Sequence, residues 1–239
     1  MHVSPLTDEC TMTANGILHD ADGRITVIKS KDLEYIPLVC FNCKNVKITK
    51  RDKKVRKLIK SFLPEVKDLY GSGDWMHTPV FQGYVELHDR YSSEKGLAGS
   101  SQTLVEFVLK NGFLPNINSF VDMYNLVSVL TGISIGAHDI EKLAGTPALE
   151  VIEQDTPFNV LGSNETATAG KGEYCYVDQA GVLCRMDIKQ CERSKITEAS
   201  ENVLVIFQGH DCLGVDDLEN GVRLLEDMWT RIDVAMKIF

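Results

Sequence analysis

The 239-residue chain lacks the features that mark several classes of protein. No apolar run approaches the roughly 20 residues that a membrane-spanning helix needs. The first ten residues, MHVSPLTDEC, do not show the basic stretch followed by an apolar one that marks a secretory signal. Neither GxGxxG nor GxxxxGKS/T occurs, so no nucleotide cofactor is expected. These absences predict a soluble, cytoplasmic protein with no cofactor and no membrane partner.

Cysteine is present but does not form a regular framework. The seven cysteines are odd in number and irregular in spacing, unlike those of a small secreted domain held by disulfides. Cys40 and Cys43 form one CxxC pair, and a structural zinc site would need a second pair at a matching distance. Buried or incidental thiols are therefore the favoured interpretation, with a redox dithiol as the alternative, and no metal site is predicted.

Acidic residues outnumber basic ones, 34 Asp and Glu against 25 Lys and Arg, which argues mildly against nucleic acid as a partner. One stretch reverses this balance, since nine of the basic residues and only one acid, Asp52, lie between Phe41 and Lys60. We call residues 44–60 the basic segment. It either contacts a phosphate backbone through salt-dependent attraction or forms a solvated helix face.

Apolar residues at helical spacing are most evident in the first half of the chain and at its end. They predict helices at residues 51–71, 78–93, 100–112, 119–132 and 216–239. Pro64 is expected to interrupt the first of these, because proline removes a backbone donor. Caps are expected at three helix starts and glycines at two helix ends, at Thr78, Ser101, Ser119, Gly112 and Gly132.

Short runs of branched and aromatic residues predict strands. They lie at residues 23–30, 35–41, 148–154, 172–178, 181–188 and 202–209, with a hairpin turn at 178–181 and a small-residue loop at 161–172. The order predicts an α+β fold, with a helix-rich N-terminal half packed on a mixed or antiparallel β-sheet. Two portions are expected, residues 1–75 and 76–239, with one continuous domain over 1–239 as the alternative.

Two long blocks resemble a known family. They are NGFLPNINSFVDMYNLVSVLTGISIGAHDIEKLAG, residues 111–145, and GEYCYVDQAGVLCRMDIKQCERSKITEASENVLVIFQG, residues 172–209. Both are similar to the tRNA-editing (B3/B4) domain of the bacterial phenylalanyl-tRNA synthetase beta subunit, and the match is closer still to stand-alone proteins that carry only that domain. The resemblance extends over residues 76–209 and implies an editing-domain architecture.

The resemblance implies a trans-editing hydrolase, an aminoacyl-tRNA deacylase whose partner is aminoacylated tRNA and not DNA. The alternatives are a non-catalytic tRNA-binding module and a binder of a small amino-acid-like ligand that no longer uses tRNA. A complete ligase is not expected, because the chain is short and has no adenylate-forming core. The basic residues expected to contact tRNA are Lys50, Arg51, Lys53, Lys54, Arg56 and Lys57.

The sequence departs from the synthetase pattern at two positions. Gly136 stands where that pattern has a histidine, and Ile206 stands where it has a pocket glutamate. The synthetase's amino-acid specificity is therefore not carried over. The stand-alone group shares the GAHD sequence around Gly136, which is expected to form a turn. Other departures from the stand-alone relatives are Asp187 and Ile188, near a tryptophan of theirs, and Ala98 and Gly99, near a basic residue.

The GAHD segment supplies the catalytic candidates, because ester hydrolysis needs an activated water and donors for the developing oxyanion. His138 is a candidate base or donor, or else a histidine packed against the sheet. Asp139 either orients His138 or caps a helix beginning at the next residue. Gly136 allows close approach of a ligand, and backbone N–H groups near it are candidate oxyanion donors.

Further polar residues are candidates for binding the substrate. Asp122 and Asn125 share one helix face, which Asn118 precedes and Ser128 extends. These side chains line a pocket or satisfy buried backbone groups. In the second block the candidates are Arg185, Gln190, Arg193 and Thr197, where the alternative is a solvated strand end.

Overall fold

The computed structural model describes residues 11–12, 16–19 and 25–232. The α-helices are α1 (Lys53–Tyr70), α2 (Pro79–Tyr91), α3 (Ser100–Asn111), α4 (Ser119–Thr131) and α5 (Val215–Arg231). The longer strands are β4 (Leu38–Cys43), β5 (Ser134–Asp139), β6 (Ala148–Val151), β7 (Thr156–Asn159), β8 (Thr166–Ala169), β9 (Tyr174–Asp178), β10 (Gly181–Arg185) and β12 (Val203–Gln208). Two-residue strands are β1 (Thr11–Met12), β2 (Leu18–His19), β3 (Ile28–Lys29) and β11 (Lys189–Gln190), and single 3-10 turns occur at Lys31–Leu33, Trp75–His77 and Ile140–Lys142.

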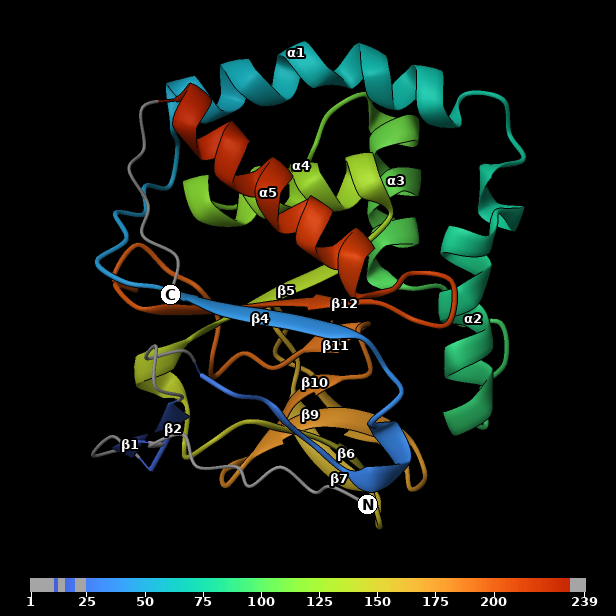
Figure 1. The fold of residues 1–239 in the computed structure, drawn as a ribbon, viewed down its shortest axis with the longest axis vertical. Coiled ribbons are helices and arrows are strands. Elements are labelled where there is room, and N and C mark those ends of the chain that lie inside the picture. The colour runs from blue at the N-terminus through green and yellow to red at the C-terminus, as the bar shows by residue number, and fades with distance from the viewer. Residues whose placement is uncertain (1–10, 13–15, 20–24, 233–239) are drawn as a thin grey trace, which may run out of the picture.

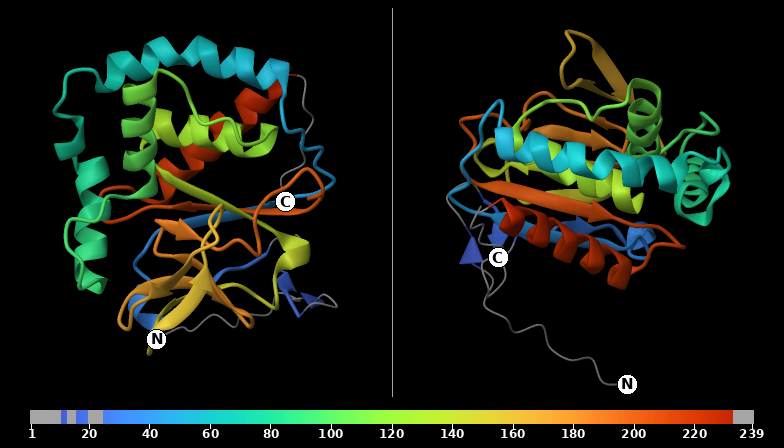
Figure 2. Two further views of the ribbon diagram at one scale, coloured as in Figure 1. Left: turned by 180° about the vertical axis from the view of Figure 1, so that it is seen from behind. Right: turned by 90° about the horizontal axis from the view of Figure 1, so that it is seen from above.

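The elements form three layers, with a three-stranded antiparallel sheet in the middle (Figure 1). Its strand order is β4-β12-β5, so β5 is an edge strand. Helices α1, α3, α4 and α5 lie on one side of this sheet, and a five-stranded sheet of order β11-β10-β9-β6-β3 lies on the other (Figures 1 and 2). The five-stranded sheet is mixed, because β3 pairs with β6 in parallel. The predicted α+β class is confirmed.

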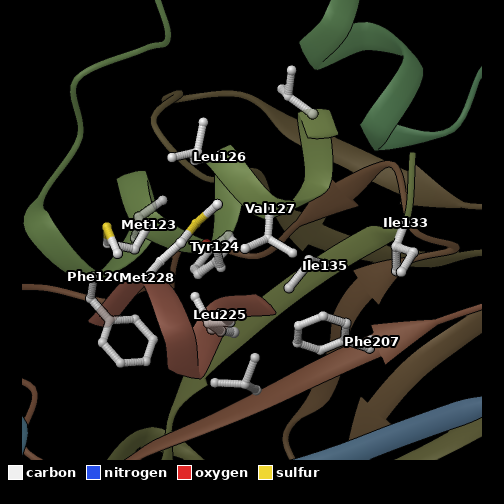
Figure 3. Close-up of a cluster of buried hydrophobic side chains, with 14 of the residues drawn as sticks. Phe120, Met123, Tyr124, Leu126, Val127, Ile133, Ile135, Phe207, Leu225 and Met228 are labelled. Atoms are coloured by element: carbon white, nitrogen blue, oxygen red, sulfur yellow. The ribbon is translucent and has the colours of Figure 1, made fainter. Parts of the chain in front are cut away.

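Two apolar cores fill the spaces between the layers. The helix-side core contains Phe207 and Ile135 from the central sheet, Val127 from α4 and Leu225 from α5 (Figure 3). The second core lies between the two sheets and contains Leu204 and Ile206 from β12, Leu149 from β6 and Leu183 from β10. Every residue of β12 is buried, which explains its almost continuous apolar sequence, VLVIFQ.

The N-terminal portion shares both large sheets with the rest of the chain. β4 pairs with β12 over six positions, from Cys43 opposite Val203 to Leu38 opposite Gln208. β3 pairs with β6. This shared pairing favours the alternative of one continuous domain over a division at residue 75.

Helix α1 runs through Pro64, so the predicted interruption is wrong. Pro64 is on the exposed face, where water can hydrate the carbonyl that loses its donor. Buried Ile59 and Val66 on either side of the proline belong to the same core and keep the helix in one direction. The side chain of Asp52 accepts hydrogen bonds from two backbone N–H groups and fixes the start of this helix.

The predicted helix ends are confirmed at Gly112 and Gly132, both left-handed, with φ 75° and 74°. The predicted helix caps at Ser101 and Ser119 are wrong, because both residues lie inside their helices. Helix α3 begins at Ser100 after Gly99, and α4 takes Asn118 as its cap. The predicted C-terminal helix is confirmed through residue 231 as α5, and residues 233–239 lie outside the described part of the chain.

Two segments expected to be irregular contain strands. The GAHD segment, expected to be a turn, forms the last four residues of β5 and pairs with β12. The small-residue loop at 161–172 includes β8, which pairs with β7. The hairpin turn between β9 and β10 is confirmed, with Gly181 opposite Asp178. Within the described residues no helix is both long and apolar enough to cross a membrane.

Candidate functional site

A cavity of about 420 Å³ lies along the outer edge of β5. β5 supplies one wall, α4 supplies another through Val121, Tyr124 and Asn125, and the segment from β10 to β11 supplies a third. The other lining residues come from α3, β9 and β12, from the segments just before α4 and just after β11, and from the residues just after β7. The volume falls within the range of roughly 300–1,000 Å³ that is typical of small-molecule sites.

Alternation along β5 places three chemically different residues on the face shared with the second core. Ser134, Gly136 and His138 are directly opposite Gln208, Ile206 and Leu204 of β12, and opposite residues of paired strands share a face. All of these except Leu204 line the cavity. The two positions that depart from the synthetase pattern, Gly136 and Ile206, are therefore direct cross-strand neighbours. A Cβ atom at Gly136 would meet nothing within 4 Å, so this position opens onto free space.

The unpaired edge of β5 presents backbone groups toward the cavity. The carbonyl of Ala137 accepts a hydrogen bond from Gln190 Nε2 (2.9 Å), and the N–H of Asp139 donates to the Ser194 carbonyl (3.0 Å). Since the N–H and C=O of one residue point to the same edge of a strand, the Ala137 N–H also lies on this edge. Ala137 itself lines the cavity.

His138 is 3% exposed and held by hydrogen bonds on one side of its ring. Its Nδ1 lies 2.8 Å from Ser194 Oγ and 3.4 Å from Gln190 Nε2. Nε2 has no hydrogen bond to any described residue. Burial lowers the pKa of His138 to about 4, with a smaller opposing effect from Asp178. The imidazole is therefore neutral at physiological pH, and Nε2 is available to a ligand.

A second polar cluster lines the cavity around Asp187, between β10 and β11. Asp187 Oδ1 lies 2.5 Å from His88 Nε2. Oδ2 accepts hydrogen bonds from the Ser100 N–H (3.0 Å) and from the Ser134 hydroxyl. The preceding residue, Met186, is left-handed with φ 49° and fully buried, and it turns the chain so that Asp187 reaches the start of α3.

Asp187 and His88 form a buried ion pair. Burial alone would raise the pKa of Asp187, but attraction to His88 and the hydrogen bonds from His88, Ser134 and Ser100 outweigh it and lower the pKa to about 2. For His88, burial alone would lower the pKa, but the carboxylate of Asp187 outweighs it and the pKa is raised. The other ring nitrogen of His88 is 2.8 Å from the Leu97 carbonyl, which fixes the ring.

The surroundings of the cavity combine apolar and cationic side chains. Ile117 and Leu161 both line the cavity, and they are 49% and 42% exposed, which is high for large apolar residues. Lys189 and Lys195 also line it, and the Lys195 ammonium is paired with Glu192. Lys195 is therefore balanced by an acid, whereas Lys189 is exposed and has no acidic partner among the described residues.

The predicted residues at the start of α4 and along it divide between cavity-lining and structural positions. Asn125 lines the main cavity and an adjoining one and makes no hydrogen bond within the described chain, so its amide is free for a ligand. Ser128 lines only the adjoining cavity and donates to the Ile133 carbonyl. Asn118 caps α4, and Asp122 accepts from the Ile117 N–H (2.8 Å), with a pKa that burial raises to about 6.

Four predicted residues are committed to partners outside the cavity lining. Asp139 accepts from the Glu141 N–H and the Ser200 hydroxyl, so it is a cap and does not orient His138. Arg185 pairs with Glu173 at 2.5 Å, Arg193 pairs with Asp178 at 2.7 Å, and Thr197 belongs to a turn with Ser200. Among the four substrate-binding candidates predicted in the second block, only Gln190 lines the cavity.

The basic segment lies on the helix side of the molecule and reaches the site at one end. Lys50, Arg51, Lys53, Arg56 and Lys57 are exposed. Lys54 is exposed too, and its ammonium donates to the Ile232 carbonyl. Thr49 exchanges hydrogen bonds with Ser119 at the start of α4, two residues after the cavity-lining Ile117. The exposed cations thus continue from the neighbourhood of the cavity along α1.

The CxxC pair is placed on both sides of the central sheet. Cys43 belongs to the helix-side core and Cys40 packs against the core between the sheets. Burial raises the pKa of each thiol to about 12. All six cysteines within the described ranges are free thiols, and no group of three potential metal ligands occurs there. These positions favour structural thiols.

The sequence interpretation missed Ser100, Ser134 and Asp187 as cavity residues. A strand assignment for residues 134–139 would have placed Ser134 on the same face as Gly136 and His138. The sequence distinguishes Asp187 only as a departure from the stand-alone relatives. Its role as a buried anion depends on His88, which is 99 residues away in the sequence.

The fold and the cavity fit a domain that holds a small ligand beside a cationic surface. The profile of the B3/4 domain matches residues 92–232, more than half of the chain, so the chain belongs to the B3/4 domain family.

Two curated relatives are phenylalanine–tRNA ligase beta subunits. That of Malacoplasma penetrans (strain HF-2) is 23% identical over 121 residues, which are 51% of this chain and 15% of that protein. That of Mycoplasma pneumoniae (strain ATCC 29342 / M129 / Subtype 1) is 27% identical over 114 residues, 47% of this chain and 14% of that protein. The chain spans about one seventh of the length of these relatives.

Among solved structures, an N-terminal fragment of the phenylalanyl-tRNA synthetase beta subunit from Pyrococcus horikoshii matches 89% of this chain and 50% of its own, with a TM-score of 0.47 and 13% identity. The predicted relationship to the synthetase beta subunit is confirmed by the family match and the curated relatives.

Proposed function

We propose that this protein is a hydrolase that removes the amino acid from a mischarged tRNA in trans. The observation that carries the proposal is the cavity on the edge of β5, which combines apolar walls with the neutral imidazole of His138 and the free amide of Asn125. It lies in a chain of the B3/4 family whose curated relatives are tRNA ligase subunits. The exposed cations of the basic segment supply the attraction that a tRNA backbone requires.

In the proposed reaction a water molecule adds to the ester carbonyl carbon and gives up a proton, and the bond between that carbon and the ribose oxygen breaks. The ribose oxygen takes a proton, and the products are a free amino acid and uncharged tRNA. A histidine with a pKa of about 4 is a weak base, so His138 positions the water through Nε2. The neighbouring ribose hydroxyl supplies the remaining assistance, and the Ala137 N–H on the β5 edge is a donor for the oxyanion.

A non-catalytic tRNA-binding module is the second candidate, and one observation favours it. Gly136 and Ile206 face each other across the β5–β12 ladder inside the cavity. Neither side chain can move a proton. A member of the family that kept the cavity for binding alone would tolerate this replacement.

Deacylation of a panel of mischarged tRNAs by the purified protein separates the two candidates. We expect release of one amino acid at least about 100-fold faster than the uncatalysed rate, and a loss of roughly tenfold or more in His138→Ala. Ser194→Ala is the matched control, because it retains the imidazole and its contact with Gln190 while removing the Ser194 hydroxyl beside Nδ1. Intact tRNA binding with no release from any member of the panel would establish the binding module instead.

A further inference from the structure

We propose that Asp187, Ser134 and Ser100 form a subsite for the α-ammonium group of an amino acid. This inference rests on the proposed function for the identity of the ligand, but it concerns a cluster with its own geometry. All three residues line the cavity, and they come from the β10–β11 connection, β5 and the start of α3. The subsite would hold the amino-acid part of the substrate independently of its side chain.

The hydrogens of this cluster are already committed among its own members. The Ser134 hydroxyl donates to Asp187 Oδ2. The Ser100 hydroxyl donates to Ser134 Oγ (3.2 Å) or to Asp187 Oδ2 (3.4 Å). The Ser100 N–H donates to the same carboxylate oxygen. The cluster therefore offers only lone pairs to a ligand.

An acceptor-only cluster selects a donor-only ligand group. An ammonium carries three donors and no acceptor, whereas a hydroxyl or a carboxylate brings lone pairs that would meet those of the cluster. Asp187 Oδ1 has His88 as its one donor among the described residues, so it retains room for a second. Together with the two hydroxyl oxygens it gives three acceptors for three N–H bonds.

The charge distribution points to the same ligand. His88, which balances Asp187, is fully buried and does not line the cavity, so only the anionic member of the pair reaches it. The Asp187 side chain is 5% exposed and thus strongly shielded from solvent. The cations that do line the cavity, Lys189 and Lys195, have solvent-exposed side chains. A metal ion would need further ligands, and the described residues contain no such group.

The remaining lining suits the rest of an amino acid. Ile135, Ile188 and Ile206 supply apolar surface for its side chain, and the free amide of Asn125 can meet its carbonyl.

The test uses small ligands without tRNA or an ester. Amides of the 20 amino acids are compared with their N-acetylated forms by titration calorimetry at pH 6.5, where the free amine is protonated. We expect at least one amide to bind at least tenfold more tightly than its acetylated form. In Asp187→Asn this preference should fall below twofold. Asn125→Ala is the matched control, which should weaken both members of a pair and preserve their ratio.

Ser134→Ala leaves the ion pair between Asp187 and His88 in place, so it carries the test if Asp187→Asn does not fold. It should reduce the preference at least threefold. Equal binding of free and acetylated amides, no binding of any amide, or a full preference in folded variants would overturn the subsite. No ester is cleaved in this binding assay, so its outcome is independent of the deacylation assay. A preference for the free amine together with no deacylation of mischarged tRNA would contradict only the proposed reaction. Deacylation of mischarged tRNA together with equal binding of free and acetylated amides would contradict only the ammonium subsite.

Discussion

His138 and Asp187 are two buried ionisable residues that line the same cavity, but His138 is neutral and Asp187 is charged. His138 has no charged partner within hydrogen-bonding distance, so burial keeps it neutral. Asp187 is paired with His88 and hydrogen-bonded by two serines, so it stays charged although it is buried. The neutral group suits positioning of a water, and the charged one suits binding of a cation.

The low pKa of His138 makes a prediction about stability. In the unfolded chain the histidine takes up a proton as the pH falls below about 6.5, while in the folded protein it does so only near 4. The stability that it contributes is therefore present above 6.5 and lost as the pH falls toward 4, and the shift corresponds to roughly 3 kcal/mol. Denaturant unfolding of His138→Gln between these pH values should show a weaker pH dependence than that of the wild type.

Comparing the pH dependence of stability of the wild type with that of His138→Gln removes the contributions of the other titrating groups. Burial lowers the pKa of His210 and raises that of Asp122, and both residues are present in the two proteins. Their contributions cancel when one pH profile is subtracted from the other. Identical profiles would show that His138 is not held neutral by burial.

At the scale of single elements, the prediction from sequence was most accurate where local chemistry determines the outcome. Gly112 and Gly132 end their helices because glycine adopts the left-handed conformation without a steric cost. The hairpin between β9 and β10 also follows from its local turn residues. These assignments depend only on neighbours in the chain.

The assignments that were wrong depend on tertiary contacts. Pro64 remains inside α1 because the buried residues on both sides of it pack into one core. The GAHD segment is a strand because β12, more than 60 residues later, pairs with it. For the same reason the sequence identified His138 and Asn125 but not Ser134 or Asp187. The cavity is assembled from segments whose proximity no local pattern records.

The basic segment makes a prediction about salt dependence. Lys50, Lys53 and Lys57 are exposed, so neutralising all three with glutamine should weaken tRNA binding. It should also reduce the slope of log affinity against log salt by roughly two to three units, since each phosphate contact contributes about 0.7–0.9. Filter binding at several salt concentrations measures both quantities.

A matched triple variant controls for net charge. Lys31, Lys142 and Lys171 are also exposed but lie outside the basic segment, so their replacement by glutamine should leave the salt slope near that of the wild type. An equal decrease in both triple variants would mean that tRNA responds to overall charge and that the basic segment is no specific contact.

At the scale of the whole molecule, the central sheet joins distant parts of the chain. β4 covers the edge of β12 that β5 leaves free. A fragment of residues 76–239 should therefore lose cooperative thermal unfolding, because buried residues of β12 would be exposed. A fragment of residues 25–239 retains β4 and should keep a single transition. Cooperative unfolding of the shorter fragment would instead support two separate domains.

We propose that the ester is cleaved in the cavity on the edge of β5. Gly136 tests it most directly, because a Cβ atom there meets no neighbour and the position opens into the cavity. In single-turnover deacylation, Gly136→Leu should lower the rate at least about 100-fold by displacing the substrate, whereas Gly136→Ala should stay within about threefold of the wild type. Both variants should remain within about 1 kcal/mol of wild-type stability. An unchanged rate in a folded Gly136→Leu protein would show that the ester is cleaved somewhere other than this cavity.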